Sequence, residues 1–496
     1  MGVPILVFPC RGLPCFAWPN PMRETGVGAD DISAFATVAE LGRLLAEGRT
    51  TSEAITGRAL ERVAAHDGAL HAFVGVFAEQ ALQAAIASDQ RRDRGEARGF
   101  LDGVPYAAKD LFHVRGWPTR AGSQALGSEP QAVTANAVTR LTEAGMVLLG
   151  KVQTVEFAFG GWGTNHVTGT PLNPRDPDVP RAPGGSSSGS GVAVAAGLVP
   201  AALGTDTGGS IRNPAAMCGI VGLKTTVGRI GRGGLLTLAT SFDSVGPLTR
   251  SVEDAALLFA AMAGRDPLDP ATFGVPPVAL SSAPEHDLAG LRLTIPAPRD
   301  LAGVEPHVLE RFRAALADLE ALGADIREKA MPRAPEAYMA LTGELMSAES
   351  WHHLGRYAGP DDSPVHPDVR SRILKGREID GARYQDLLEQ RRAAQIEFAA
   401  YLEGADALLT PTAPILPPPL AEIDETKTPL GTFTRFVNLM DMAALSVPTG
   451  LVGTGLPTAL QIAVPRFEEA LALRIGRALE IRRGGLFEPP PAYETP

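Results

Sequence analysis

The sequence predicts an α/β fold formed as one large domain. Helical periodicity alternates with short apolar runs along most of the chain, and this alternation is typical of α/β proteins. The chain has 496 residues, of which 45% are hydrophobic and 20% are charged, so it can bury a large core. The composition changes too little along the chain to mark a second domain.

The folded part is predicted to open with three helices, over residues 37–47, 51–64 and 77–91. Apolar side chains recur there at helical spacing, and Thr37 stands where an N-cap is needed. Residues 1–30 lack such periodicity and contain proline-rich and aromatic pieces. We expect them to form a disordered or loosely packed extension, and no signal peptide is predicted because no basic segment precedes the apolar run.

The middle of the chain shows the alternation most clearly. A helix over 136–144 ends at Gly145 and leads into a short buried strand over 146–149. A charged helical segment covers 351–397. The remaining expected elements are helices over 192–198, 252–263 and 306–322, and strands over 291–295, 407–412, 445–448 and 459–464.

The net charge of −11 disfavours nucleic acids and anionic membranes as partners, because both attract lysine and arginine. The sequence contains no run of about eighteen apolar residues, so no membrane span is predicted. The three cysteines form neither a disulfide framework nor a zinc-binding spacing, and the nine histidines show no metal spacing. We therefore expect a cytoplasmic protein without a metal, an organic cofactor, a nucleic acid or a membrane as partner.

Two glycine- and serine-rich loops carry the strongest functional signal. They cover residues 183–191 and 204–212, and an apolar run joins them. Upstream, Lys109 ends another apolar stretch. Glycine and serine clusters usually mark turns. Here they flank segments that should be buried, and a buried lysine is costly unless a site uses it. A lysine and two serines suffice for nucleophilic acyl transfer.

Two other segments resemble known functional motifs but lack features that those motifs require. Residues 145–151 nearly match a phosphate-binding P-loop, but Val152 stands where a serine or threonine is needed. Residues 185–189 match the G-x-S-x-G pattern of a nucleophile elbow. The preceding residues, 176–183, contain three prolines and cannot form the buried strand that this elbow needs.

At these loops the chain resembles the amidase signature family. The family's pattern runs through residues 183–212 and continues over 214–224. One departure is Lys151-Val152-Gln153, where the family commonly has Lys-Thr-Asn. The resemblance implies a single amidase signature domain over residues 31–490, with a mixed central β-sheet flanked by helices.

The resemblance also implies roles for individual residues. Ser210 is expected to be the nucleophile, Ser186 a bridging serine that relays protons and follows a cis peptide bond, and Lys109 the base. Lysine can act as a base only when burial lowers its pKa enough to make it neutral. The expected oxyanion hole consists of the backbone N–H groups of Thr207, Gly208, Gly209 and Ser210. Supporting residues are expected to be Ser187, Asp206 and Arg212.

A substrate pocket is predicted from aromatic residues beside the catalytic loops. An acyl site needs apolar walls with few polar groups. Such walls would suit an apolar or aromatic acyl group better than glutamine. The predicted lining residues are Phe157, Phe159, Trp162, Phe436, Asn438 and Met440.

Three functions fit the sequence; the first is the one that we expect, and the other two are alternatives. The first is hydrolysis of small or aryl amides or carbamates by an enzyme that acts alone or as a homodimer. The second is a urea-, biuret- or allophanate-type hydrolase, since residues 434–441 resemble the allophanate hydrolase branch. The third is the glutamine-hydrolysing subunit of a tRNA-dependent amidotransferase, although an acidic residue of that branch is replaced near Gly431. A non-catalytic protein is disfavoured because Ser210 and Lys109 are both present.

Overall fold

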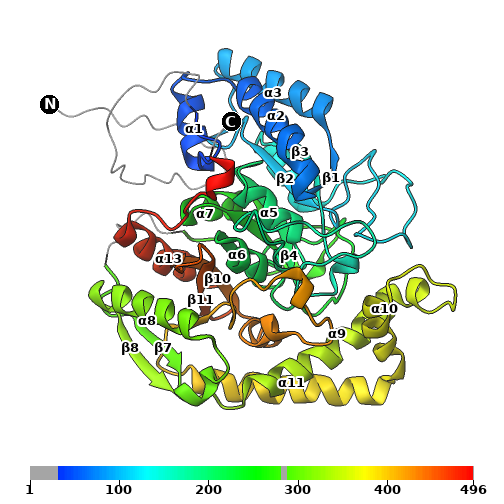
Figure 1. The fold of residues 1–496 in the computed structure, drawn as a ribbon, viewed down its shortest axis with the longest axis vertical. Helices are drawn as coiled ribbons and strands as arrows, with labels where there is room; N and C mark the ends of the chain where they lie inside the picture. Colours follow the sequence, from blue (N-terminus) through cyan, green and yellow to red (C-terminus); the bar gives the residue numbers. More distant parts are fainter. Residues whose placement is uncertain (1–31, 281–286, 495–496) are drawn as a thin grey trace.

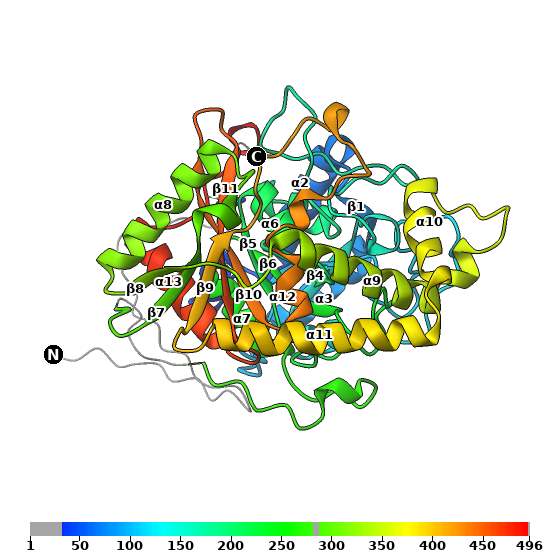
Figure 2. The same cartoon turned by 90° about the horizontal axis from the view of Figure 1, so that it is seen from below.

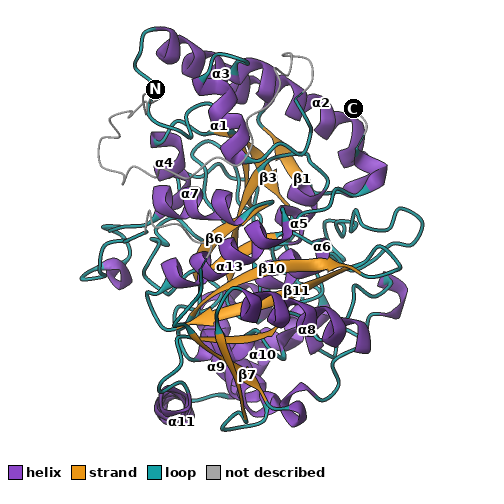
Figure 3. Ribbon diagram, turned by 90° about the vertical axis from the view of Figure 1, so that its left-hand side faces the viewer, coloured by secondary structure: helices purple, strands orange, loops and turns teal. Residues whose placement is uncertain are grey.

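The computed structural model describes residues 32–280 and 287–494. The prediction for residues 1–30 therefore lies outside the described residues. A mixed β-sheet runs through the middle of the molecule, with helices on both sides (Figure 3). This arrangement confirms the predicted α/β fold.

The described strands form one sheet in the order β1-β3-β2-β4-β6-β5-β10-β11-β9-β7-β8. Parallel pairing joins β2 to β3 and β4, and joins β7 to β8 and β9, while the other neighbours are antiparallel. The strands are β1 (Phe73–Val76), β2 (Pro105–Lys109), β3 (Val147–Val152), β4 (Ala201–Asp206), β5 (Val221–Lys224), β6 (Ser244–Thr249), β7 (Arg292–Pro296), β8 (Asp325–Lys329), β9 (Ala407–Pro411), β10 (Ala443–Leu451) and β11 (Pro457–Val464).

The helices cover the sheet and extend beyond one end of it (Figure 1). None of the helices in the described residues is long and apolar enough to cross a membrane. The α-helices are α1 (Val38–Ala46), α2 (Ser52–Leu70), α3 (Ala78–Asp93), α4 (Asn136–Glu143), α5 (Ser188–Ala195), α6 (Arg212–Cys218), α7 (Val252–Met262), α8 (Pro306–Ala321), α9 (Pro335–Ala358), α10 (Pro367–Leu374), α11 (Gly381–Tyr401), α12 (Arg435–Leu439) and α13 (Glu469–Arg483).

Most predicted elements occur within a few residues of their expected bounds. Helix α1 has the expected Thr37 cap, which accepts a hydrogen bond from the Glu40 backbone N–H at 3.1 Å. Strands β2 and β4 were not predicted as strands, because small residues dominate them and neither alternates apolar with polar residues. Both are fully buried and have neighbours on both sides in the sheet, so tertiary contacts rather than local propensity determine their conformation.

The sheet brings the sequence motifs to one edge. Strands β2 and β4 are parallel neighbours, so Lys109 and Asp206, their last residues, lie at the same edge. The two glycine-rich loops lead into α5 and α6 beside that edge. Helices α9, α10 and α11 lie together at one end of the molecule (Figure 1), and the view from that end shows α9 close to α12, which it contacts (Figure 2). This end of the molecule supplies side chains to the site from far along the chain.

Candidate active site

Lys109 lies fully buried at the end of β2 and contacts the first serine loop. Its Nζ donates hydrogen bonds to Ser186 Oγ at 2.8 Å and to Thr205 Oγ1 at 2.9 Å. Burial lowers the pKa of Lys109 to about 7, against the attraction of Asp243 and Asp206, which raises it. A substantial fraction of Lys109 is therefore neutral near neutral pH, as proton abstraction by an amine requires.

The loop before α5 holds Ser186 beside the nucleophile loop, residues 204–212, which carries the expected nucleophile Ser210. The Gly185–Ser186 peptide bond is cis, as the resemblance implies. The Ser187 backbone N–H donates to the Ser210 carbonyl at 3.1 Å. The Ser187 hydroxyl donates to the Thr205 carbonyl and accepts from the Thr205 N–H, both at 3.3 Å. Ser187 thus ties the two serine loops to β4.

Ser210 stands between β4 and α6 and is 7% exposed. Within the described residues its hydroxyl makes no hydrogen bond, so it is free to meet a substrate. The backbone N–H groups of Thr207, Gly208 and Ser210 likewise have no acceptor in this part of the structure. The Gly209 N–H differs, because it donates to Asp206 Oδ1 at 2.8 Å. This corrects the expectation that all four N–H groups face an oxyanion, since that of Gly209 is already bonded.

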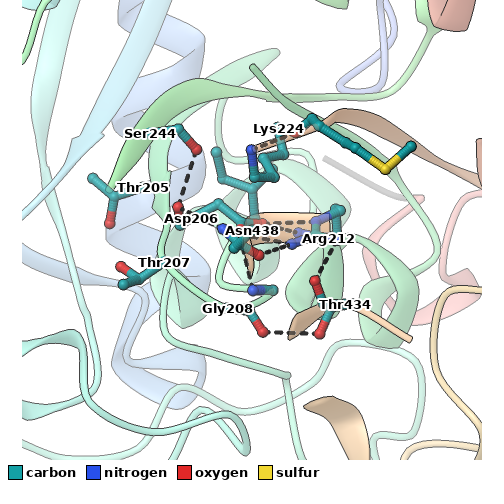
Figure 4. A network of polar contacts seen from close by, with 12 residues as sticks. Thr205, Asp206, Thr207, Gly208, Arg212, Lys224, Ser244, Thr434 and Asn438 are labelled. Carbon is teal, nitrogen blue, oxygen red and sulfur yellow. Dashed lines mark hydrogen bonds and ion pairs between the residues drawn. The ribbon is translucent and has the colours of Figure 1, made fainter. Parts of the chain in front are cut away.

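Asp206 organises the nucleophile loop through a buried ion pair with Arg212 (Figure 4). The Arg212 Nε and Nη2 donate to the two carboxylate oxygens at 3.0 and 2.8 Å, and the Ile211 N–H adds a bond at 3.1 Å. Burial alone would raise the pKa of Asp206, but the Arg212 guanidinium holds it well below its usual range. A charged carboxylate therefore fixes the loop that carries Ser210.

Replacing Asp206 by asparagine is expected to lower the free energy of unfolding by about 3–5 kcal/mol, because it leaves the buried Arg212 charge without its counter-ion. Urea denaturation of the purified protein measures this loss. Asp325→Asn is the control, since Asp325 pairs with Arg327 on the exposed strand β8. Equal stability of Asp206→Asn and the native protein would contradict this role for the ion pair.

A cavity opens beside Ser210. Its walls and mouth bound about 520 Å³ of space, part of which is open to solvent. Phe159 and Trp162 line it, and the Trp162 Nε1 donates to the Lys427 carbonyl at 3.0 Å. The other lining residues are Ala158, Gly160, Gly161, Gly185, Gly208, Asn213, Met346, Arg372, Thr428, Leu430, Gly431 and Arg435.

Four residues predicted to line the pocket lie elsewhere. Phe157 is buried and stacks on Tyr357, with ring centroids 5.8 Å apart. Phe436 is buried against Phe398, with ring centroids 5.4 Å apart. Met440 packs on the same hydrophobic core. Residues on one short helix face different ways, so α12 directs some side chains to the core and others to the cavity.

Asn438 is the fourth, and its role is to bind Asp206 and Arg212. Its Nδ2 donates to Asp206 Oδ1 at 2.9 Å, and its Oδ1 accepts from Arg212 Nη2 (Figure 4). The carboxamide is therefore fully used inside the protein. Its place in the network depends on the packing of α12 against the nucleophile loop.

Two arginines in the cavity were not anticipated from the sequence. Arg372 comes from α10 and Arg435 from the first turn of α12. Their presence corrects the expectation of an apolar wall suited to an aromatic acyl group. The charged character of residues 351–397 was visible in the sequence, but not that α10 would turn one of its arginines toward Ser210.

A cluster of possible metal ligands lies close to this cavity, although the histidines show no metal spacing in the sequence. Ligand atoms of His166, His366 and Asp368 lie within 4.8 Å of one another. The two imidazole rings stack at 4.6 Å with an interplanar angle of 28°. The three residues line a second pocket, which shares Arg372 with the cavity beside Ser210.

Comparison with known proteins extends these observations to most of the chain. The model of the Amidase family matches residues 54–473. The chain is 37% identical over 477 residues to a glutamyl-tRNA(Gln) amidotransferase subunit from Chloroflexus aggregans, and the match covers 90% of this chain and 96% of that protein.

Solved structures show the same similarity. A chain from a structure described as a vestigial protein complex that reveals the evolutionary origins of an s-triazine catabolic enzyme superposes with a TM-score of 0.84 and 32% identity, over 92% of this chain and 100% of that one. The peptide amidase of Stenotrophomonas maltophilia superposes with a TM-score of 0.80 and 30% identity, over 92% and 98% of the two chains.

The comparisons correct the predicted partners. We expected a small-molecule amide or carbamate substrate, no nucleic acid and at most a homodimer. This prediction is wrong, because the curated relatives are subunits of a glutamyl-tRNA(Gln) amidotransferase. The net charge of a chain indicates how strongly that chain itself attracts phosphate groups. It does not report whether that chain serves a tRNA substrate that another subunit holds.

Proposed function

Because this chain belongs to the amidase family, we propose that it hydrolyses an amide C–N bond through an acyl-enzyme on Ser210 and supplies ammonia within a tRNA-dependent amidotransferase. The observation that carries the chemistry is the buried Lys109–Ser186 hydrogen bond beside a free Ser210 hydroxyl. The relatives that are glutamyl-tRNA(Gln) amidotransferase subunits favour the amidotransferase role over that of a stand-alone amidase.

The proposed reaction begins with attack of Ser210 Oγ on the amide carbon. The Ser210 proton passes to Ser186, whose own proton passes to neutral Lys109. The free N–H groups of Thr207, Gly208 and Ser210 stabilise the oxyanion that forms. The proton then returns through Ser186 to the leaving nitrogen, and the C–N bond breaks. Water hydrolyses the acyl-enzyme by the same proton route, which releases the acid and restores the three side chains.

The two glycines of the nucleophile loop serve close approach. A Cβ at Gly209 would lie 2.4 Å from Thr434 Oγ1, and φ there is +124°, so only glycine fits. A Cβ at Gly208 would lie 3.4 Å from Arg435 Cγ and would narrow the cavity. Both positions keep the backbone next to the carbonyl that is attacked.

A second candidate is hydrolysis of an amide whose acyl part carries a negative charge but no ammonium group. The specific observation is that no aspartate or glutamate lines the cavity among the described residues, whereas two arginines do. An ammonium group such as that of glutamine would find no carboxylate there. The second candidate differs from the first in the source of ammonia, not in the catalytic steps.

Ammonia release decides between the two candidates. The purified chain is assayed with glutamine and with the monoamide of glutaric acid, alone and with the other subunits of an amidotransferase and glutamyl-tRNA(Gln). We expect ammonia from glutamine that rises when the other subunits and the charged tRNA are present. Release only from the monoamide, unaffected by those additions, would favour the second candidate. No release from any amide would contradict the proposed function.

A further inference from the structure

Arg435 extends from the first turn of α12 into the cavity beside Ser210. Its position follows from two glycines. A Cβ at Gly208 would lie 3.4 Å from Arg435 Cγ, and a Cβ at Gly431 would lie 2.9 Å from its Nε. A side chain at Gly431 would therefore displace the guanidinium. The missing side chains at Gly208 and Gly431 thus leave room for Arg435 next to the loop that carries Ser210.

The Arg435 guanidinium has no counter-ion among the described residues. Its only hydrogen bond there is a long one, from Nη1 to the Met339 carbonyl at 3.5 Å. Arg372, the other arginine of the cavity, differs in this respect. It donates to Glu425 Oε2 at 3.0 Å and to the Phe159 carbonyl at 2.7 Å. Arg372 is thus neutralised inside the protein, and Arg435 carries the uncompensated charge of the cavity.

An uncompensated guanidinium away from bulk water is costly. Its removal from water and the nearby Arg372 lower the pKa of Arg435 to about 10, so it stays charged at neutral pH. A second polar group of the cavity is the side chain of Asn213. Asn213 Oδ1 is buried with no hydrogen bond to the described residues. The Arg435 guanidinium and Asn213 Oδ1 together indicate a ligand that has an anionic group and a separate hydrogen-bond donor.

We propose that Arg435 binds a carboxylate on the acyl part of the substrate, so that the enzyme selects amides of short dicarboxylic acids. A guanidinium presents paired N–H donors that match the two oxygens of a carboxylate. The amide carbon then lies at Ser210, and the carboxylate anchors the far end of the acyl chain. This inference rests on the proposed function, and it holds for both candidate substrates because glutamine also carries a carboxylate.

Binding to a protein that cannot turn over tests the inference apart from catalysis. In Ser210→Ala protein, calorimetry compares the monoamide of glutaric acid with pentanamide, a neutral amide of the same chain length. We expect the charged amide to bind at least about 10-fold more tightly. Adding Arg435→Met should remove this advantage by weakening the charged amide and leaving pentanamide unchanged. The monoamides of malonic and succinic acids then show which length spans the cavity.

Two controls separate charge recognition from stability. Arg327→Met, on the exposed strand β8, removes an arginine outside the cavity and should leave the preference intact. If Arg435→Met fails to fold, native protein gives the answer, since glutarate should slow labelling of Ser210 by a fluorophosphonate and pentanol should not. Equal binding of the charged and neutral amides, or unchanged labelling with glutarate, would overturn the inference.

The outcomes also distinguish this inference from the proposed function. Hydrolysis of both amides with equal affinity would retain the function and overturn the role of Arg435. A strong preference for the charged amide in Ser210→Ala, without hydrolysis by the native protein, would support the role of Arg435 and contradict the function.

Discussion

Replacing Ser210 by alanine is expected to reduce turnover by about five orders of magnitude while the protein stays folded. The loss is large because Ser210 and Thr428 supply the hydroxyls that line the cavity in the described part of the chain, and Thr428 does not belong to the loop that carries the unbonded N–H groups. Alanine removes the attacking oxygen without filling space, so the Asp206–Arg212 ion pair and the cavity should persist. Steady-state kinetics with thermal unfolding as a companion measurement checks both parts.

The control for Ser210 is another buried serine of the same region. Ser190 lies on α5, donates only to the Leu203 carbonyl at 2.9 Å and does not line the cavity. Ser190→Ala should retain the native reaction with a fluorophosphonate probe, and Ser210→Ala should lose it. Mass spectrometry locates the labelled residue. An adduct on Ser187 would instead support the nucleophile elbow that the preceding prolines argue against.

The glycine- and serine-rich loops and the buried Lys109 could be expected from the sequence because local patterns mark them. Glycines beside serines indicate close backbone approach, and a lysine that ends an apolar run must be buried. The strands that hold Lys109 and Asp206 could not be predicted as strands. Both contain mainly small residues, and they form strands by pairing with neighbours that are distant in sequence.

The substrate cavity could not be predicted in the same way, because it is assembled from distant segments. Residues 434–441 could be assigned to the site, but not the direction of each side chain. Phe436 packs into the core, Asn438 binds Arg212 over a separation of 226 positions, and Arg435 enters the cavity. Each outcome depends on the orientation of α12 about its axis relative to α9 and the nucleophile loop. A helix of five residues is too short for its hydrophobic periodicity to define that orientation.

The Asp206–Arg212–Asn438 network could be predicted only in part from the sequence. Asp206 and Arg212 could be expected to brace the loop, because they flank Ser210 in the sequence. That the network also uses Asn438 follows only from the fold. One buried carboxylate thus joins the loop that carries Ser210 to α12, the helix that carries Arg435.

Replacing Lys109 by alanine is expected to lower kcat/KM by about 1,000-fold, the range typical of general acid–base catalysis. Lys109→Arg should not restore activity, because a guanidinium stays protonated and cannot accept the serine proton. Lys224→Arg is a useful comparison. Lys224 is also fully buried, but its Nζ donates to the Thr225 and Met442 carbonyls rather than to a serine hydroxyl. Any activity lost there should follow lost stability.

The pH dependence of the native enzyme separates a catalytic lysine from a structural one. Burial lowers the pKa of Lys109 to about 7, so the neutral, proton-accepting form increases as pH rises through that value. The activity of the native protein should therefore rise from pH 6 to pH 8 and then level off. The residual activity of Lys109→Ala should lose this step, because the group that titrates is gone. If Lys109 had only a structural role, its replacement would change the amount of folded protein but not the midpoint of the pH–activity curve. If Lys109→Ala keeps the native midpoint, or if Lys109→Arg is as active as the native enzyme, Lys109 is not the base.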